Sequence, residues 1–195
     1  MELVREAPAD VDCVIPFPDS GIYASLGVAQ EAGVPYEHAL IRNHYVGRTF
    51  IQPSQSMRQF SVRVKINPVH SMIEGKRLFV VDDSIVRGTT VRTRVAKLRD
   101  MGAKEVHFRV SCPPIRYGCF YVIDFPSTKE LVAVQHAPEE LAALLGLDSL
   151  HYLSLEGLKS SVSCPDHYCT ACFDGNYPTA LPSVRDKNSL EYVRK

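Results

Sequence analysis

The sequence has 195 residues, of which 22 are Lys or Arg and 22 are Asp or Glu, so the formal net charge is zero. Hydrophobic residues make up 45% and charged residues 23%, values typical of a soluble globular protein and not of a disordered chain. The neutral balance argues against a general nucleic-acid binder, and no apolar run reaches the ~18 residues of a membrane span. Because no apolar segment follows Met1, we expect no signal peptide and a cytoplasmic location, where the six cysteines are thiols or metal ligands.

Strand and helix patterns alternate through the first two thirds of the chain, which favours an α/β fold with a parallel sheet. In chain order the expected elements are a strand at Val11–Phe17, a helix at Ile22–Glu31 ended by Gly33, a strand at Leu78–Val81, a helix capped by Thr89 or Thr90 and ended by Gly102, a strand at Val106–Val110 and a helix at Pro138–Leu145. Two short helices are also predicted, one from the Asn67–Pro68 pair and one from a capping box that begins at Ser127.

A basic segment separates the first predicted helix from the second predicted strand. His38–Ile73 holds no Asp or Glu over 36 residues, and within it Asn43–Phe60 has no convincing period and is expected to be a long loop. Loops of this length in a compact domain are usually functional or disordered. Two interpretations stay open: a solvated basic face, or a mobile lid that meets an anion.

Residues 79–90, with the sequence FVVDDSIVRGTT, carry the clearest chemical pattern. An apolar strand runs into Asp82 and Asp83, a small-residue loop follows, and a helix then begins. Ligands of open α/β sheets bind at the carboxyl ends of the strands, and loop N–H groups at a helix N-terminus suit a phosphate. The two carboxylates suit polyol hydroxyls or a divalent cation. The alternative is a surface turn with exposed carboxylates.

This string resembles the phosphoribosyl-pyrophosphate (PRPP) loop of type I phosphoribosyltransferases. Further segments are similar to the amidophosphoribosyltransferase family, also called glutamine PRPP amidotransferases, which catalyse the first committed step of purine synthesis; these segments are residues 16–21, 42–51, 53–56, 124–126 and 152–158. The resemblance runs from about Asp12 to Pro178. It implies a type I phosphoribosyltransferase fold, a mostly parallel sheet flanked by helices, at residues 1–160. A loop-rich, cysteine-containing C-terminal segment at residues 161–195 would pack on the same domain.

The resemblance also implies roles for individual residues. It assigns PRPP binding to Asp19, Ser20, Gly21, Asp82, Asp83, Ser84, Ile85, Val86, Arg87, Gly88, Thr89 and Thr90. Catalysis would rest on Asp82, Asp83 and Arg48, with Mg²⁺ held by Ser20, Asp82 and Asp83 and the lid formed by Asn43–Phe60. Arg48 and Arg87 are expected either to contact phosphate or to form surface ion pairs.

The family normally carries an N-terminal glutaminase domain with a nucleophilic cysteine, and nothing in this sequence matches it. The first cysteine, Cys13, lies inside a predicted strand and is expected to be a buried core thiol. The resemblance therefore implies 5-phosphoribosylamine and pyrophosphate made from PRPP and ammonia, with glutamine used only through a separate or missing glutaminase. It also implies a homo-oligomer, with purine nucleotides as feedback inhibitors and neither nucleic acid nor membrane as a partner. The sequence leaves three rivals open: a non-catalytic PRPP-sensing regulator, an inactive fragment, and a transferase that uses a base as acceptor.

Three cysteines near the end of the chain have ligand-type spacing. Cys164, Cys169 and Cys172 form C-x4-C-x2-C, a spacing that also occurs in iron–sulfur proteins. Some members of the family carry a [4Fe–4S] cluster, and their ligand pattern matches Cys119, Cys169 and Cys172, with Cys164 as a candidate for the fourth ligand. A four-cysteine zinc site and thiols in a loose tail are the alternatives.

Overall fold

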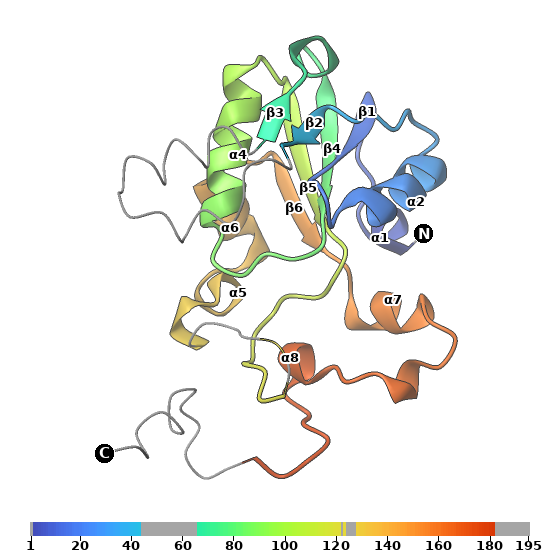
Figure 1. Cartoon of the computed structure of the whole chain (residues 1–195), viewed down its shortest axis with the longest axis vertical. Coiled ribbons are helices and arrows are strands. Elements are labelled where there is room, and N and C mark those ends of the chain that lie inside the picture. Colours follow the sequence, from blue (N-terminus) through green and yellow to red (C-terminus); the bar gives the residue numbers. More distant parts are fainter. Residues whose placement is uncertain (1, 44–65, 122, 124–127, 182–195) are drawn as a thin grey trace.

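The chain folds around a four-stranded sheet in the order β1-β4-β5-β6 (Figure 1). The computed structural model of the protein describes residues 2–43, 66–121, 123 and 128–181. The strands are β1 (Cys13–Pro16), β4 (Arg77–Asp82), β5 (Glu105–Val110) and β6 (Ser149–Tyr152), and all neighbouring pairs are parallel. Their carboxyl ends therefore meet at one edge of the sheet, where Pro16 lies opposite Val81 and Asp82 opposite Val110.

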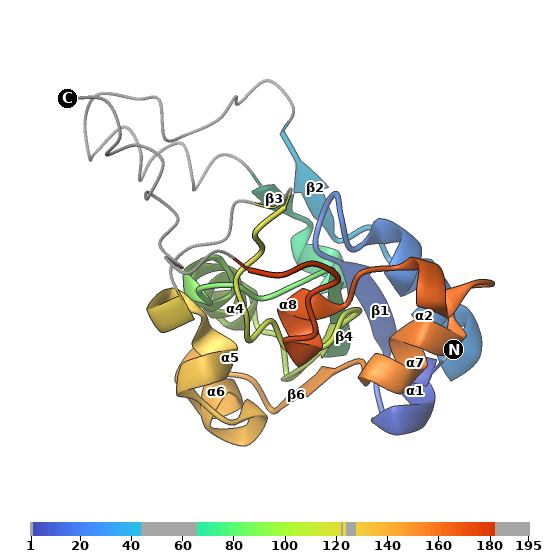
Figure 2. The ribbon, with the colours of Figure 1, turned by 90° about the horizontal axis from the view of Figure 1, so that it is seen from below.

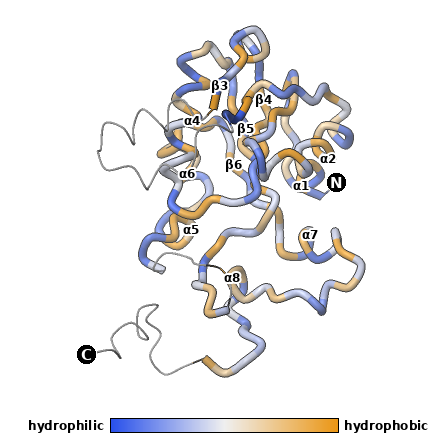
Figure 3. Tube along the Cα trace, in the orientation of Figure 1, coloured by the Kyte–Doolittle hydropathy of each residue, from blue (hydrophilic) through white to orange (hydrophobic). Residues whose placement is uncertain are grey.

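Alternation along β4 divides the core into two layers. Leu78 and Val80 face one cluster of buried residues, whereas Phe79 and Val81 face the other, and all four side chains are fully buried. The first layer includes residues of α4 (Thr89–Asp100) and α6 (Pro138–Leu145), and the second includes residues of α1 (Glu2–Glu6), α2 (Ile22–Ala32) and α7 (Leu155–Ser160). Figure 1 shows these two groups of helices on opposite sides of the sheet, and Figure 3 shows hydrophobic residues along the strands and helices between more hydrophilic connections. This arrangement confirms the predicted α/β fold.

A small antiparallel pair corrects one prediction. Leu40–Arg42 (β2) pairs with Ile66–Pro68 (β3), so that Asn67 and Pro68 end a strand and do not begin a helix. Ile66 is buried in the core, and burial together with pairing to β2 outweighs the local capping preference. Pro68 is tolerated at a strand end because its missing N–H breaks no interior ladder. Only a 3₁₀ turn, η2 (His70–Met72), follows.

The helix after the 79–90 motif starts differently from the prediction. α4 begins at Thr89, as expected, but the capping position belongs to Gly88 with φ 75°, and no side chain caps the helix. The predicted cap by Thr89 or Thr90 is therefore wrong, because the loop enters the helix through a left-handed glycine. In contrast, the predicted ends at Gly33, Gly102 and Gly146 are all glycines with positive φ. The capping box itself starts at Ser127, outside the described residues; Thr128–Glu130 forms a 3₁₀ turn (η3) that leads into α5 (Val132–Gln135).

The described C-terminal residues lie against the segment that follows β5 (Figure 2). They form a 3₁₀ turn, η4 (Pro165–His167), and a short helix, α8 (Ala171–Asp174). The backbone N–H groups of Arg116 and Tyr117 both donate to the carbonyl of Cys172, and the Tyr177 hydroxyl donates to the carbonyl of Gly118 at 2.7 Å. The boundary at residue 160 stays a prediction. Among the helices that the structure describes, none has the length and hydrophobicity of a membrane span.

Candidate functional site

Two loops meet at the carboxyl edge of the sheet and bring together residues that are distant in sequence. The loop after β1 places Ser20 beside the end of β4. The Ser20 hydroxyl lies 2.9 Å from Oδ1 of Asp83 and 3.3 Å from Oδ1 of Asp82, as a donor to both carboxylates. The structure thus brings together the three residues predicted to hold Mg²⁺. Asp82 is the last residue of β4, and the strand residues directly before it are buried. The exposed Asp83 is the first residue after the strand.

Close backbone packing holds the first loop in place. Phe17 N–H donates to the carbonyl of Val81, and Gly21 N–H donates to the carbonyl of Phe17. A Cβ atom at Gly21 would lie 2.2 Å from the carbonyl oxygen of Val81, so no larger residue fits without movement of the backbone. The peptide bond between Pro18 and Asp19 is cis. Gly21 therefore fixes the distance between this loop and the end of β4.

Asp82 and Asp83 bring two acidic groups together, and this raises the pKa of Asp82. Asp82 is 8% exposed, and burial raises its pKa to about 8, with the hydrogen bond and the negative charge of Asp83 acting in the same direction. Two carboxylates in contact, one of them buried, favour a bound cation or a shared proton. Oxygen donors of this type suit Mg²⁺, which usually binds proteins through one or two carboxylates together with substrate phosphates. The donor set thus fits Mg²⁺.

Arg94 is a neighbour of this pair that the sequence analysis did not single out. Its guanidinium carbon lies 4.8 Å from the centroid of the Phe17 ring, and its positive charge opposes the rise in the pKa of Asp82. The signal was present in the helix period, since position 94 lies three residues after Val91 and four before Leu98, on the buried face of α4.

Arg42 is the second basic residue that sequence reasoning missed. It stands at the end of β2 and forms an ion pair with Asp19, one of the predicted pyrophosphate-loop residues. Its buried Nε–H has no hydrogen-bond partner among the described residues. The arginine therefore holds Asp19 and keeps one buried donor without a partner among the described residues.

The loop Ser84–Thr90 is anchored by its apolar residues. Ile85 is buried, the carbonyl of Val86 accepts a hydrogen bond from Val132 N–H at 2.9 Å, and Gly88 packs near Leu145. The remaining residues, Ser84, Arg87, Thr89 and Thr90, are partly or fully exposed at the N-terminus of α4. This arrangement fits the predicted phosphate cradle, because the apolar anchors leave the polar groups near the positive end of the helix dipole.

Of the two arginines expected to contact phosphate, only one is described. Arg87 forms an exposed ion pair with Glu130 at 2.8 Å, which matches the surface ion-pair interpretation in this state of the molecule. Such pairs contribute at most about 1 kcal/mol, so a phosphate could displace Glu130 at low cost. Arg48 and the lid beyond Asn43 lie outside the described residues, as does the family string at 124–126.

The cysteines gather without completing a metal site. Burial raises the pKa of the Cys172 thiol, and the neighbouring thiols of Cys119 and Cys169 raise it further, so these three groups lie near one another. Cys164 is exposed and is not among the groups that act on Cys172. Within the described ranges, no group of three or more His, Cys, Asp or Glu side chains is arranged to hold a metal ion. The described donors therefore do not by themselves fit a [4Fe–4S] cluster.

Two further thiols, Cys13 and Cys112, lie outside this group. Cys13 is 1% exposed, as predicted. Burial raises the pKa of Cys112 to about 12, and the charges of Asp83, Cys172 and Asp82 act in the same direction.

A parallel sheet with a carboxylate pair, a small-residue loop and a helix N-terminus at its carboxyl edge defines a type I phosphoribosyltransferase domain. Solved structures share this fold: the structure described as "glutamine phosphoribosylpyrophosphate (PRPP) amidotransferase from B. subtilis complexed with ADP and GMP" is 47% identical with a TM-score of 0.83, covering 93% of this chain and 41% of that chain. A structure described as the "allosteric regulatory enzyme of purine biosynthesis" is 46% identical with a TM-score of 0.82, covering 93% of this chain and 40% of that chain.

Comparison with curated relatives identifies the family to which the chain belongs. The amidophosphoribosyltransferase of Synechococcus elongatus is 50% identical over 194 residues, covering 98% of this chain and 39% of that protein. The amidophosphoribosyltransferase of Methanothermobacter thermautotrophicus is 49% identical over 193 residues, covering 98% of this chain and 40% of that protein. No family model matches the chain. The chain belongs to the amidophosphoribosyltransferase family as its C-terminal phosphoribosyltransferase domain. It spans about two fifths of the length of the relatives that it matches.

Proposed function

We propose that the chain transfers the phosphoribosyl group of PRPP to ammonia, giving 5-phosphoribosylamine and pyrophosphate, the first step of de novo purine synthesis. The observation that carries this proposal is the contact of Ser20 with Asp82 and Asp83. This contact joins the predicted pyrophosphate loop to the predicted ribose-binding carboxylates, so one ligand could engage both. The family membership supports the same chemistry.

Each part of the site then has a role in the proposed reaction. The lone pair of ammonia forms a bond to C1 of the ribose, the bond from C1 to the pyrophosphate oxygen breaks with its electron pair, and the nitrogen loses a proton to water. Asp82 and Asp83 accept hydrogen bonds from the ribose hydroxyls and, with Ser20, would hold Mg²⁺. Bound there, Mg²⁺ would offset the negative charge of the leaving pyrophosphate. The loop Ser84–Thr90 holds the 5′-phosphate, and the loop Asp19–Gly21 receives the pyrophosphate.

Arg48 and the lid complete the proposal from outside the described residues. We assign Arg48 to the leaving pyrophosphate, and the lid Asn43–Phe60 to the exclusion of water that would otherwise hydrolyse PRPP. The basic, acid-free composition of this segment supports the assignment.

The proposed partners follow from the family and not from this chain alone. Glutamine would serve only through a glutaminase domain or subunit, and this chain would use free ammonia. The B. subtilis structure is described as a complex with ADP and GMP, which supports purine nucleotides as inhibitors here. A homo-oligomer, a cytoplasmic location and the absence of nucleic-acid and membrane partners stay predictions.

The test combines binding with turnover. Calorimetry with PRPP and Mg²⁺ should show Mg²⁺-dependent binding, and ammonia at alkaline pH should give phosphoribosylamine whereas glutamine should not. Asp82→Asn with Asp83→Asn should lose most of the Mg²⁺-dependent affinity, whereas the exposed Asp100→Asn at the end of α4 should not. Unchanged PRPP affinity in the double variant would exclude the assignment. PRPP binding without any product would favour the sensing or inactive alternatives.

A further inference from the structure

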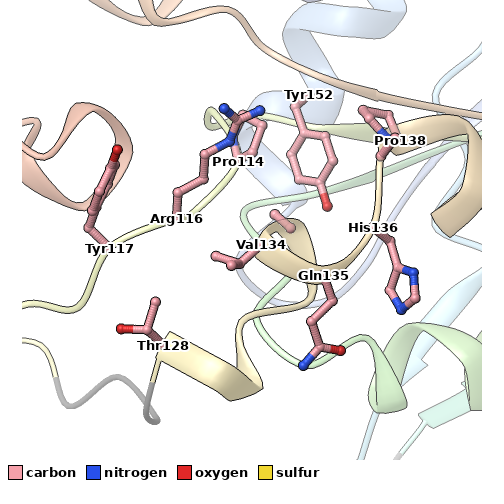
Figure 4. Close-up of a pocket in the computed structure, with 11 residues that line it drawn as sticks. Pro114, Arg116, Tyr117, Thr128, Val134, Gln135, His136, Pro138 and Tyr152 are labelled. Carbon is pink, nitrogen blue, oxygen red and sulfur yellow. The ribbon is translucent and has the colours of Figure 1, made fainter.

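A groove at the carboxyl end of β6 is separate from the proposed PRPP site. It consists of two adjoining cavities of about 560 and 340 Å³ that share Pro114, Arg116, Pro138 and Tyr152 (Figure 4). The larger cavity extends to α5 and the residues that follow it, and the smaller extends towards α7 and α8. None of the described residues assigned to PRPP lines either cavity.

Tyr152 lines both cavities and carries a polar group that is unpaired among the described residues. The residue is 7% exposed, and its buried hydroxyl has no hydrogen-bond partner among the described residues. Figure 4 shows this hydroxyl directed into the cavity, on the side of Val134 and Gln135. A buried hydroxyl without a partner is costly, so its position indicates where a ligand atom would accept or donate a hydrogen bond. Burial raises the pKa of Tyr152, which keeps the hydroxyl protonated as a donor.

Arg116 contributes a positive charge to the wall of the groove. In the described part of the chain its guanidinium forms no ion pair or side-chain hydrogen bond. The two histidines of the groove do have acidic neighbours: His136 in the larger cavity lies 3.0 Å from Glu140, and His151 in the smaller cavity lies 3.1 Å from Glu6. The backbone of Arg116 is held in place by its N–H bond to the carbonyl of Cys172 at 3.0 Å. The larger cavity therefore presents one positive charge without a described ion-pair partner, on a fixed backbone and with no acidic side chain in its described lining, whereas Glu139 adds a carboxylate to the wall of the smaller cavity.

The rest of the shared wall is apolar. Pro114 and Pro138 line both cavities, and Val134 and Tyr117 add to the larger one. Flat apolar walls suit a planar apolar body, and a single arginine matches a singly charged carboxylate in a bidentate pair. A phosphate monoester carries about two negative charges near neutral pH and would leave one of them uncompensated.

We propose that this groove binds a small organic carboxylate with a flat apolar body, with its carboxylate on Arg116 and a polar atom on the Tyr152 hydroxyl. The inference is independent of the proposed transferase activity, because the groove shares none of the described residues assigned to that activity. A carboxylate bound here would contact the segment after β5, in which the N–H groups of Arg116 and Tyr117 donate to the carbonyl of Cys172.

The test uses 4-hydroxybenzoate and phenylacetate as carboxylate probes and benzyl alcohol as the neutral control, with ligand-observed NMR and calorimetry on the whole chain. We expect saturable binding of at least one carboxylate in the millimolar range or tighter, and about tenfold weaker binding in Arg116→Gln and in Tyr152→Phe. Arg92→Gln, on the exposed face of α4, should bind as the unchanged protein does.

Folding of the variants is controlled independently. Tyr152→Phe removes a hydroxyl that has no described partner, so its melting temperature should stay equal or rise. PRPP affinity should be unchanged in both variants, which separates this site from the transferase site. The proposal is overturned if no carboxylate binds, if benzyl alcohol binds as well as the carboxylates, or if either folded variant keeps full affinity.

Discussion

Ser20 and Asp83 lie 63 positions apart, yet the Ser20 hydroxyl donates to the Asp83 carboxylate at 2.9 Å. The bond connects the loop after β1 to the end of β4, two neighbouring parallel strands. A hydroxyl and a carboxylate in contact at the surface form a preorganised pair of oxygen ligands, because neither needs to move far to meet a cation. The relationship makes the first loop part of the carboxylate site and not a separate turn.

Ser20→Ala should therefore weaken Mg²⁺-dependent PRPP binding without loss of the fold. Ser20 is exposed, so its removal leaves no cavity, whereas one oxygen ligand and one hydrogen bond to the carboxylates disappear. We expect about a tenfold loss of affinity, the size of one hydrogen bond to a charged group. Calorimetry decides this, with the exposed Ser161→Ala as matched control. Equal affinities for the two variants would remove Ser20 from the site.

The raised pKa of Asp82 predicts a pH dependence with a definite sign. Because the folded protein keeps the Asp82 proton up to about pH 8 whereas the unfolded chain loses it near pH 4, the folded state binds more protons between these values. Stability of the ligand-free protein should therefore fall as pH rises from about 4 to 8, and Asp82→Asn should flatten this fall. Thermal melts across this range, without Mg²⁺, measure it. Mg²⁺ affinity should increase over the same range, and a pH-independent affinity would contradict the assignment.

The fold was predictable to the extent that local patterns and burial agree. The apolar runs of β1, β4 and β5 and the glycines that end α2, α4 and α6 required no tertiary information. Asn67–Pro68 was mispredicted because pairing with β2, which is distant in sequence, overrides a local capping signal.

The candidate site also contains residues that are predictable from the sequence and residues that are not. Asp82, Asp83 and the small-residue loop are contiguous and therefore visible in the sequence. Arg42 and the buried hydroxyl of Tyr152 become functional candidates only in the folded chain. For Arg94 the helix period indicates the buried face, but its contact with Phe17 is made only by folding. Which group the Arg94 side chain contacts depends on the residues packed against α4, here the ring of Phe17.

Gly21→Ala should destabilise the protein and abolish PRPP binding together. The new Cβ would meet the carbonyl oxygen of Val81 at 2.2 Å, and this atom belongs to the rigid backbone of β4. We expect a loss of about 1–3 kcal/mol from the free energy of unfolding, the usual range for overpacking. Chemical denaturation measures the loss. Gly118→Ala is the matched control, because nothing lies within 4 Å of its Cβ and its φ is not positive. Equal stabilities of the two variants would show that the first loop moves freely.

Arg94→Gln should shift the proton equilibrium of Asp82. Because the positive charge of Arg94 lowers the pKa of that carboxyl, its removal should raise this pKa further and move the pH of half-maximal Mg²⁺ binding upwards. Arg92→Gln, exposed on the same helix, should leave the midpoint in place. Calorimetry at several pH values separates a shifted midpoint from a general loss of affinity. A loss that is uniform with pH would assign Arg94 to packing on Phe17 alone.

The isolated chain should hold no stable iron–sulfur cluster. Cys119, Cys169 and Cys172 lie near one another, but three thiolates leave one corner of a [4Fe–4S] cluster without a protein ligand and open to oxygen and exchange. Anaerobic reconstitution followed by iron and sulfide analysis should therefore give cluster that is lost on exposure to air. Cys169→Ser should remove the reconstituted iron, whereas Cys164→Ser should not, because Cys164 is outside the group that acts on Cys172. An air-stable cluster with four irons per chain that depends on Cys164 would instead show that this thiol closes the site.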